Sequence, residues 1–245
     1  MGAPMPTFLA VRLAAYGLLP ILLIAGPGPA SGASGTADWR ILVAFAAIWL
    51  PAEFRLVAGV HLPAGAPGGV DSARLAIVDL ALVLFVAARP MPGIGYTFRL
   101  GRRELGAAGL AFVAFAAVAI PLGLGIGFIR YGPKPFDAVQ WAARAVAIYF
   151  LIALPEELLF RGLLQNLLER RRPAGWPAAS PLLSAAVIFG LAHLDNRPAP
   201  NVRYAFLATL AGIAYGWVWA RTRKVTASAL THATVDLVWG LMFKG

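Results

Sequence analysis

The sequence of this 245-residue chain contains no cysteine, which excludes disulfides, thiolate catalysis and metal sites with cysteine ligands. Charged residues are also scarce, at 13% against about 25% in soluble domains, whereas hydrophobic residues make up 60% against about 45–50%. A soluble chain of this length cannot cover so much apolar side chain with 21 Lys and Arg, 11 Asp and Glu and 3 His. The composition therefore excludes a soluble enzyme and a disordered chain, and indicates a multi-pass membrane protein.

The formal net charge of +10 does not indicate nucleic-acid binding. Basic residues stand singly or in twos and threes between long apolar runs, as they do in loops that flank membrane spans. The interleaving of aromatic and basic residues on a polar domain, typical of nucleic-acid surfaces, is absent. We therefore expect the lipid bilayer, and no nucleic acid, among the partners of this chain; its oligomeric state is not set by the sequence.

Apolar runs predict about eight membrane spans, because a bilayer core of about 30 Å needs about 20 apolar residues in a helix. We place the spans at residues 8–25, 41–60, 74–89, 105–129, 137–169, 180–195, 203–221 and 226–243. Short segments rich in Pro and Gly separate them, and nothing marks a soluble domain. The expected fold is an all-α, polytopic transmembrane helical bundle, and the high Ala, Gly and Arg content favours a bacterial inner membrane.

The distribution of basic residues between alternate loops predicts an orientation. One set of loops is the richer, with Arg40, Arg89, Arg99, Arg102, Arg103, Arg170, Arg171, Arg172, Arg221, Arg223 and Lys224. The opposite set holds Arg74, Arg130, Lys134, Arg197 and Arg203. The positive-inside rule then places the richer set in the cytoplasm and, with eight spans, both termini outside.

The first cluster of ionisable residues inside a predicted span is Glu156, Glu157 and Arg161. Such groups are costly in lipid and therefore indicate function, although a solvated pair at a helix end is the structural alternative. Adjacent residues project about 100° apart on a helix, so the two carboxylates have different roles. Glu157 and Arg161, four residues apart, are expected to pair on one face. Glu156 is then the freer carboxylate, able to accept a proton from water. Pro155 is expected to kink this long helix.

Two of the three histidines lie in later apolar runs. His193 comes near the end of the run 180–195, where an interfacial histidine is the alternative to a catalytic one. His232 and Asp236 are four residues apart in the last span, which stacks them on one face. A carboxylate beside an imidazole fixes its tautomer and raises its basicity. A structural hydrogen bond between helices is the alternative for this pair.

Together the clusters form three ordered motifs, each on its own apolar helix: Glu156-Glu157-x-x-x-Arg161, Phe189-x-x-x-His193 and His232-x-x-x-Asp236. In this pattern the sequence resembles the CPBP family of intramembrane proteases, which includes the type II CAAX prenyl endopeptidases and relatives linked to bacteriocin processing or immunity. The resemblance covers about residues 137–243. We expect residues 137–245 to form a CPBP-type catalytic core, preceded by non-diagnostic transmembrane helices in residues 1–136.

The resemblance implies an intramembrane endopeptidase that cleaves a membrane-associated or lipid-linked protein or peptide substrate. Glu156 and His193 would activate a water, and His232 and Asp236 would stabilise the oxyanion. The residues agree with this chemistry, because with no cysteine and no evident serine nucleophile, water is the reasonable nucleophile. Arg161 is expected to orient Glu157 rather than to touch substrate.

Three alternatives stay open. No cofactor is favoured, and the first alternative is a zinc ion held by Glu156, His193 and His232. The His-Glu-x-x-His spacing typical of zinc proteases is absent. A proton-coupled transporter is the second, since intramembrane ionisable groups also form proton relays, which Asp79 and Arg144 would extend. A catalytically idle membrane scaffold is the third. The motifs do not define the substrate.

Overall fold

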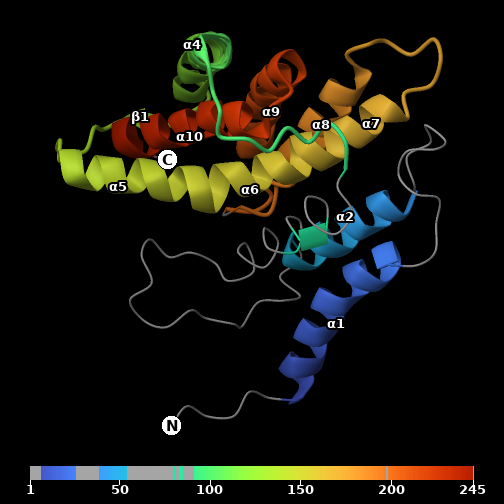
Figure 1. Cartoon of the computed structure of the whole chain (residues 1–245). Coiled ribbons are helices and arrows are strands. Elements are labelled where there is room, and N and C mark those ends of the chain that lie inside the picture. Colours follow the sequence, from blue (N-terminus) through green and yellow to red (C-terminus); the bar gives the residue numbers. More distant parts are fainter. Residues whose placement is uncertain are drawn as a thin grey trace. The chain divides into compact units, whose positions relative to one another are not determined.

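The computed structural model describes residues 7–25, 39–53, 80, 83–84, 91–196 and 198–244. The chain divides into two compact units, Met1–Pro92 and Gly93–Gly245. The described residues are mostly helical, which confirms the all-α prediction (Figure 1). The predicted division between an N-terminal region and a catalytic core, at residues 136 and 137, remains a prediction.

In the part of the first unit that the structure describes, α1 (Thr7–Ala25) and α2 (Trp39–Glu53) pack against each other. The Tyr16 hydroxyl of α1 donates a hydrogen bond of 2.8 Å to the Ile48 carbonyl of α2, so a polar group ties the two apolar helices together. The third predicted span, 74–89, lies almost wholly outside the described residues, and so does Asp79.

The second unit begins with an extended segment and α4 (Arg102–Gly125). Glu104 in the first turn accepts a 2.7 Å hydrogen bond from the Gly101 amide, which satisfies one of the free amides at this helix end. A short antiparallel pair, β1 (Arg130–Tyr131) and β2 (Phe243–Lys244), is the only sheet among the described residues, and it joins the loop after α4 to the end of the last helix.

A continuous helix of 33 residues, Ala138–Arg170, carries the first motif. Its segments are α5 (Ala138–Ile148), a π-helical η3 (Tyr149–Ala153), α6 (Leu154–Glu157), a π-helical η4 (Leu158–Gln165) and α7 (Asn166–Arg170). The winding changes on both sides of Pro155, the residue predicted to disturb the helix. The Leu154 amide bonds to the Tyr149 carbonyl five residues earlier, so wider turns accommodate the missing proline donor without ending the helix.

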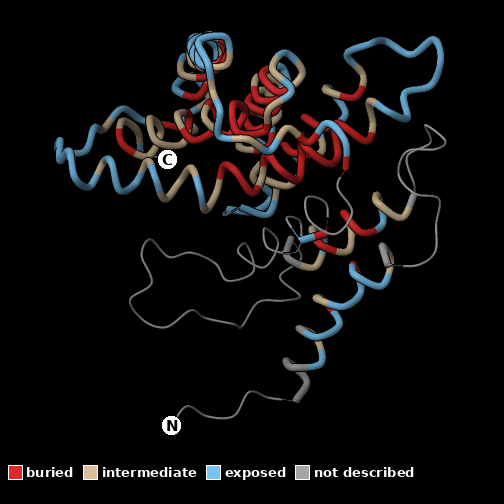
Figure 2. The backbone as a smooth tube through the Cα atoms, in the orientation of Figure 1, coloured by how far each residue is buried: buried red, intermediate tan, exposed pale blue. Residues whose placement is uncertain are grey.

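The other two motifs lie on α8 (Ser180–Leu191) and α10 (Val225–Met242), with α9 (Val202–Thr222) between them in sequence. A Cβ on Gly190 would lie 1.9 Å from the Thr209 Oγ1, so only glycine allows α8 to approach α9 this closely. α10 lies alongside the long helix, and it also contacts α4 and α9 (Figure 1). The buried residues concentrate where these helices meet (Figure 2).

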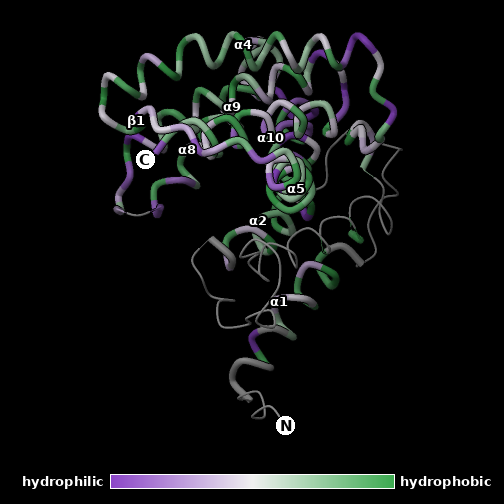
Figure 3. Tube along the Cα trace, turned by 90° about the vertical axis from the view of Figure 1, so that its left-hand side faces the viewer, coloured by the Kyte–Doolittle hydropathy of each residue, from purple (hydrophilic) through white to green (hydrophobic). Residues whose placement is uncertain are grey.

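Two described helices, Arg102–Gly125 and Ala138–Arg170, are long and apolar enough to cross a membrane; shorter apolar helices include Arg40–Pro51 and Ser180–Leu191. On α4, Leu110 and Val113 are each 61% exposed, and the helix is hydrophobic along much of its length (Figure 3). Exposed apolar side chains in such number fit a surface that faces lipid. The protein is therefore an integral membrane protein.

Candidate active site

The centre of the candidate site is a buried ion pair. Glu157 and Arg161 are both 0% exposed, and the Arg161 Nη1 donates to the Glu157 Oε1 at 2.8 Å. This is the pair that the four-residue spacing predicts. The Arg161 Nη2 donates to the Gly212 carbonyl of α9 at 3.1 Å, and the guanidinium lies 4.5 Å from the centre of the Phe189 ring of α8. One arginine thus joins the first-motif helix to two others.

Two side chains of α10 complete the surroundings of Glu157. The Ser228 hydroxyl lies 2.5 Å from the Glu157 Oε2, and the His232 Nδ1 lies 2.9 Å from its Oε1. Both oxygens of this carboxylate therefore have partners from the protein, and no part of it is exposed. An acceptor enclosed in this way is suited to holding its neighbours in place rather than to taking a proton from water.

His232 presents different groups at its two ring nitrogens. Nδ1 faces Glu157, which leaves Nε2 toward Asp236 Oδ2 at 3.5 Å and Glu156 Oε2 at 4.0 Å. Each nitrogen of the His232 ring therefore has a carboxylate oxygen within 4.0 Å. The predicted stacking of His232 and Asp236 on one face is present.

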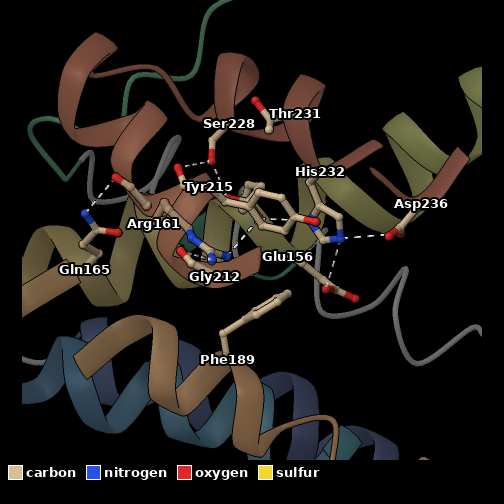
Figure 4. A network of polar contacts seen from close by, with 12 residues as sticks. Glu156, Arg161, Gln165, Phe189, Gly212, Tyr215, Ser228, Thr231, His232 and Asp236 are labelled. Atoms are coloured by element: carbon tan, nitrogen blue, oxygen red, sulfur yellow. Dashed lines mark hydrogen bonds and ion pairs between the residues drawn. The ribbon is translucent and has the colours of Figure 1, made fainter. Parts of the chain in front are cut away.

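The two sides of the His232 ring also differ in exposure. The side chains of Glu156 and Asp236 are 22% and 28% exposed, against 0% for Glu157. In Figure 4 both lie on the same side of the ring, away from Arg161. We call Glu157, Arg161 and Ser228 the closed side, and Glu156 and Asp236 the open side. The adjacent glutamates of the first motif thus lie on opposite sides.

His193 lies just beyond the end of α8, at the edge of this cluster. Its Nδ1 lies 2.8 Å from the Phe189 carbonyl, so Nε2 remains for other partners. The Phe189 ring lies 4.8 Å from the His193 ring and 5.8 Å from the His232 ring, centre to centre. The charges of Glu156, His232 and Asp236 act on His193, but it forms no hydrogen bond or ion pair with them in the described contacts.

The sequence predicts no role in the site for three further residues of the cluster. Ser228 bonds Glu157, Phe189 covers Arg161, and Tyr215 of α9 stacks on His232 with 4.5 Å between ring centres and 14° between planes. A signal existed for Ser228, because it lies four residues before His232 in an apolar helix and so shares its face. Tyr215 gave no such signal, since contacts between helices depend on the fold.

Part of the chain is similar to a known protein family. Residues 138–238 match the family model of Rce1-like type II CAAX prenyl endopeptidases. Over these residues, which are less than half of the chain, the protein is similar to the CAAX proteases. No curated protein and no solved structure matched the chain.

All six predicted site residues lie within the CAAX-protease match: Glu156, Glu157, Arg161, His193, His232 and Asp236. The match supports a membrane hydrolase of the CAAX-type endopeptidase class in general terms. It covers the long helix, α8, α9 and most of α10, and leaves the first unit and α4 outside.

The donor set of the described site fits a zinc site poorly. Among the described residues, no group of three or more His, Cys, Asp or Glu side chains is arranged to hold a metal ion. Glu157 has both oxygens bonded within the protein. The hydrogen bond described for His193 goes to the Phe189 carbonyl and not to Glu156 or His232, the other two ligands that the predicted zinc site would require.

Proposed function

We propose that this protein is an intramembrane endopeptidase that hydrolyses a peptide bond in a membrane-associated or lipid-linked protein, using water activated by Glu156 with His193. The observation that carries the proposal is the contrast between the adjacent glutamates. Glu157 is enclosed and fully bonded, whereas Glu156 is partly exposed beside the His232 Nε2. A partly exposed carboxylate near a cationic donor can take a proton from water, as general base catalysis requires.

The proposed reaction has two stages. Glu156 removes a proton from the water as its oxygen attacks the scissile carbonyl carbon, and the carbonyl oxygen becomes an oxyanion. The His232 Nε2–H, oriented by Asp236, donates to that oxygen. When the intermediate collapses, the carbon–nitrogen bond breaks and Glu156 returns the proton to the leaving amine. His193, with its Nε2 available, positions the water.

The closed side has a supporting role in this mechanism. Glu157 accepts from the His232 Nδ1, which fixes the ring plane and turns Nε2 toward the open side. Arg161 neutralises Glu157 in surroundings where an unpaired charge is costly. Ser228 holds the second oxygen of Glu157. The three side chains thus aim His232 without touching substrate.

The number of membrane spans and the presence of a pocket are part of the same proposal. We infer a multi-pass bundle of about eight spans in a bacterial inner membrane, with a polar, wet pocket at Glu156, His193 and His232. The exposed apolar surface of α4 and the length of the helix Ala138–Arg170 support a membrane-embedded core. The substrate is a protein or peptide that the bilayer delivers laterally to this pocket.

The experiment that tests the activity compares purified wild type with Glu156→Gln in proteoliposomes. The peptides offered are a farnesylated peptide ending in a CAAX sequence, the same peptide without the farnesyl group, and an apolar membrane-tail peptide. We expect cleavage of at least one by wild type and at least about 100-fold slower cleavage by the variant, in the range of general base effects. Equal cleavage by both, or none by wild type, contradicts the proposal. The latter outcome favours the transporter or scaffold alternatives.

We further propose that the mechanism is that of a glutamic endopeptidase without metal, which the poor fit of the donor set to zinc supports. Wild type purified after prolonged treatment with a strong chelator should cleave the same peptide at an unchanged rate. Elemental analysis of the preparation should show zinc far below one ion per chain. Stoichiometric zinc with activity that is lost in chelator and restored by zinc would establish the metalloprotease alternative.

A further inference from the structure

We propose that the Tyr215 hydroxyl is a second hydrogen-bond donor to the oxyanion, beside His232. This inference rests on the proposed function. Tyr215 lies on α9, and its ring stacks on the His232 ring with 4.5 Å between centres and 14° between planes. In Figure 4 the phenol extends along the imidazole toward the side of Glu156 and Asp236. Its hydroxyl therefore points to the open side, where the proposed chemistry takes place.

The rest of Tyr215 is held by the closed side. Its carbonyl lies 2.7 Å from the Ser228 hydroxyl, and Arg161 lies 5.3 Å from its ring centre. The Phe189 ring meets it edge to face at 6.1 Å. These contacts fix the ring on three sides, so the position of the hydroxyl is set before substrate arrives. Such preorganisation is what makes an oxyanion donor effective.

Tyr215 is only 1% exposed. Its carbonyl lies beside the Ser228 hydroxyl, but the described contacts include no hydrogen bond of its own hydroxyl. A phenol so little exposed needs a hydrogen-bond partner, because an unpaired buried donor is costly. In the proposed complex the substrate oxygen is that partner.

The neighbours of the hydroxyl point to an oxyanion rather than to a proton transfer. The carboxylates of Glu156 and Asp236 lie on the side of the stacked rings to which the phenol extends (Figure 4). A phenol O–H can donate to an oxyanion that forms there. The His232 Nε2–H and the Tyr215 O–H then converge on one oxygen from stacked rings. The proton stays on Tyr215 throughout, and no bond to this residue forms or breaks.

The test is Tyr215→Phe, which keeps the stacked ring and removes only the hydroxyl. With the peptide that wild type cleaves in the panel above, we expect kcat to fall about 100-fold, the loss typical of one oxyanion donor, with KM within about twofold. The matched control is Tyr149→Phe. The Tyr149 hydroxyl donates to the Thr226 carbonyl at 3.2 Å, away from the site, so this variant should lose some thermal stability and keep kcat.

A second variant keeps the test valid if Tyr215→Phe folds poorly. Replacing Tyr215 with 3,5-difluorotyrosine retains the ring and hydroxyl but makes the hydroxyl more acidic. The rate should then fall at alkaline pH, where the fluorinated phenol ionises and loses its donor, while wild type stays active. A wild-type pH profile in this variant, or a kcat within twofold of wild type in a folded Tyr215→Phe, would overturn the inference.

The outcome for Glu156→Gln separates this inference from the proposed function. An inactive Glu156→Gln together with a fully active Tyr215→Phe removes Tyr215 from the mechanism and leaves the endopeptidase intact. An active Glu156→Gln, or a wild type that cleaves none of the peptides, overturns both.

Discussion

Carboxylates lie on both sides of the His232 ring, but the two sides differ in burial and in their contacts. On the closed side, Glu157 is 0% exposed and bonded to Arg161, Ser228 and His232. On the open side, Glu156 and Asp236 approach the Nε2 at 4.0 and 3.5 Å and remain partly exposed. One turn of helix thus supplies an enclosed carboxylate and a partly exposed one, which is the proposed base. The difference lies in burial and in the number of partners, not in the residue type.

The most direct test of this difference is to replace Glu by Gln, an isosteric change, on both sides. Glu157→Gln removes the charge that Arg161 and His232 need in a buried position. It should destabilise the fold by about 3–5 kcal/mol, the cost of breaking a buried pair. Glu156→Gln should change stability by less than about 0.5 kcal/mol, because its side chain is partly exposed and approaches His232 only to 4.0 Å. Unfolding in detergent measures both, and equal losses would show that the two sides do not differ.

The two histidines provide a second test of the difference between the sides. His193→Ala and His232→Ala should both abolish peptide cleavage. Only His232→Ala should also lower the unfolding free energy, by about 1–3 kcal/mol, because it removes the partner of the buried Glu157 Oε1. His193 bonds only to the Phe189 carbonyl and lies at a helix end, so its loss should leave the melting temperature nearly unchanged. Cleavage that survives the loss of either histidine contradicts the site.

Ser228→Ala tests whether the closed side acts only through position. The hydroxyl lies between the Glu157 Oε2 and the Tyr215 carbonyl, at 2.5 and 2.7 Å. Its removal should cost about 1–2 kcal/mol in stability, since the single hydroxyl proton that these two buried acceptors share is lost. KM should not change, and kcat should fall by less than tenfold, because the ion pair still holds Glu157. A complete loss of activity in a folded Ser228→Ala would place Ser228 in the chemistry instead.

These contrasts show which features of the site can be predicted from the sequence. The spacing of four residues predicted the Glu157–Arg161 pair and the shared face of His232 and Asp236, because a helix fixes such neighbours locally. That Glu157 bonds His232, 75 positions later, depends on how α10 packs against the long helix, and no local rule encodes it. The same holds for Tyr215 and for Phe189 over Arg161. The all-α fold followed from apolar composition alone, whereas the π-helical turns around Pro155 reflect packing that a periodicity cannot show.

The smallest expected effect concerns Asp236. Its Oδ2 lies 3.5 Å from the His232 Nε2, where it is placed to orient the ring. Asp236→Asn keeps an oxygen that can accept from Nε2–H but removes the charge, so we expect kcat to fall by only about three- to tenfold, or about 0.7–1.4 kcal/mol of transition-state stabilisation. Asp236→Ala, which removes the acceptor too, should lose considerably more. Since Glu157 still holds the other nitrogen, both variants should fold as wild type does. If Asp236→Asn were instead as inactive as Glu156→Gln, the charge of Asp236 would be essential, and the open side would contain two reactive carboxylates rather than one.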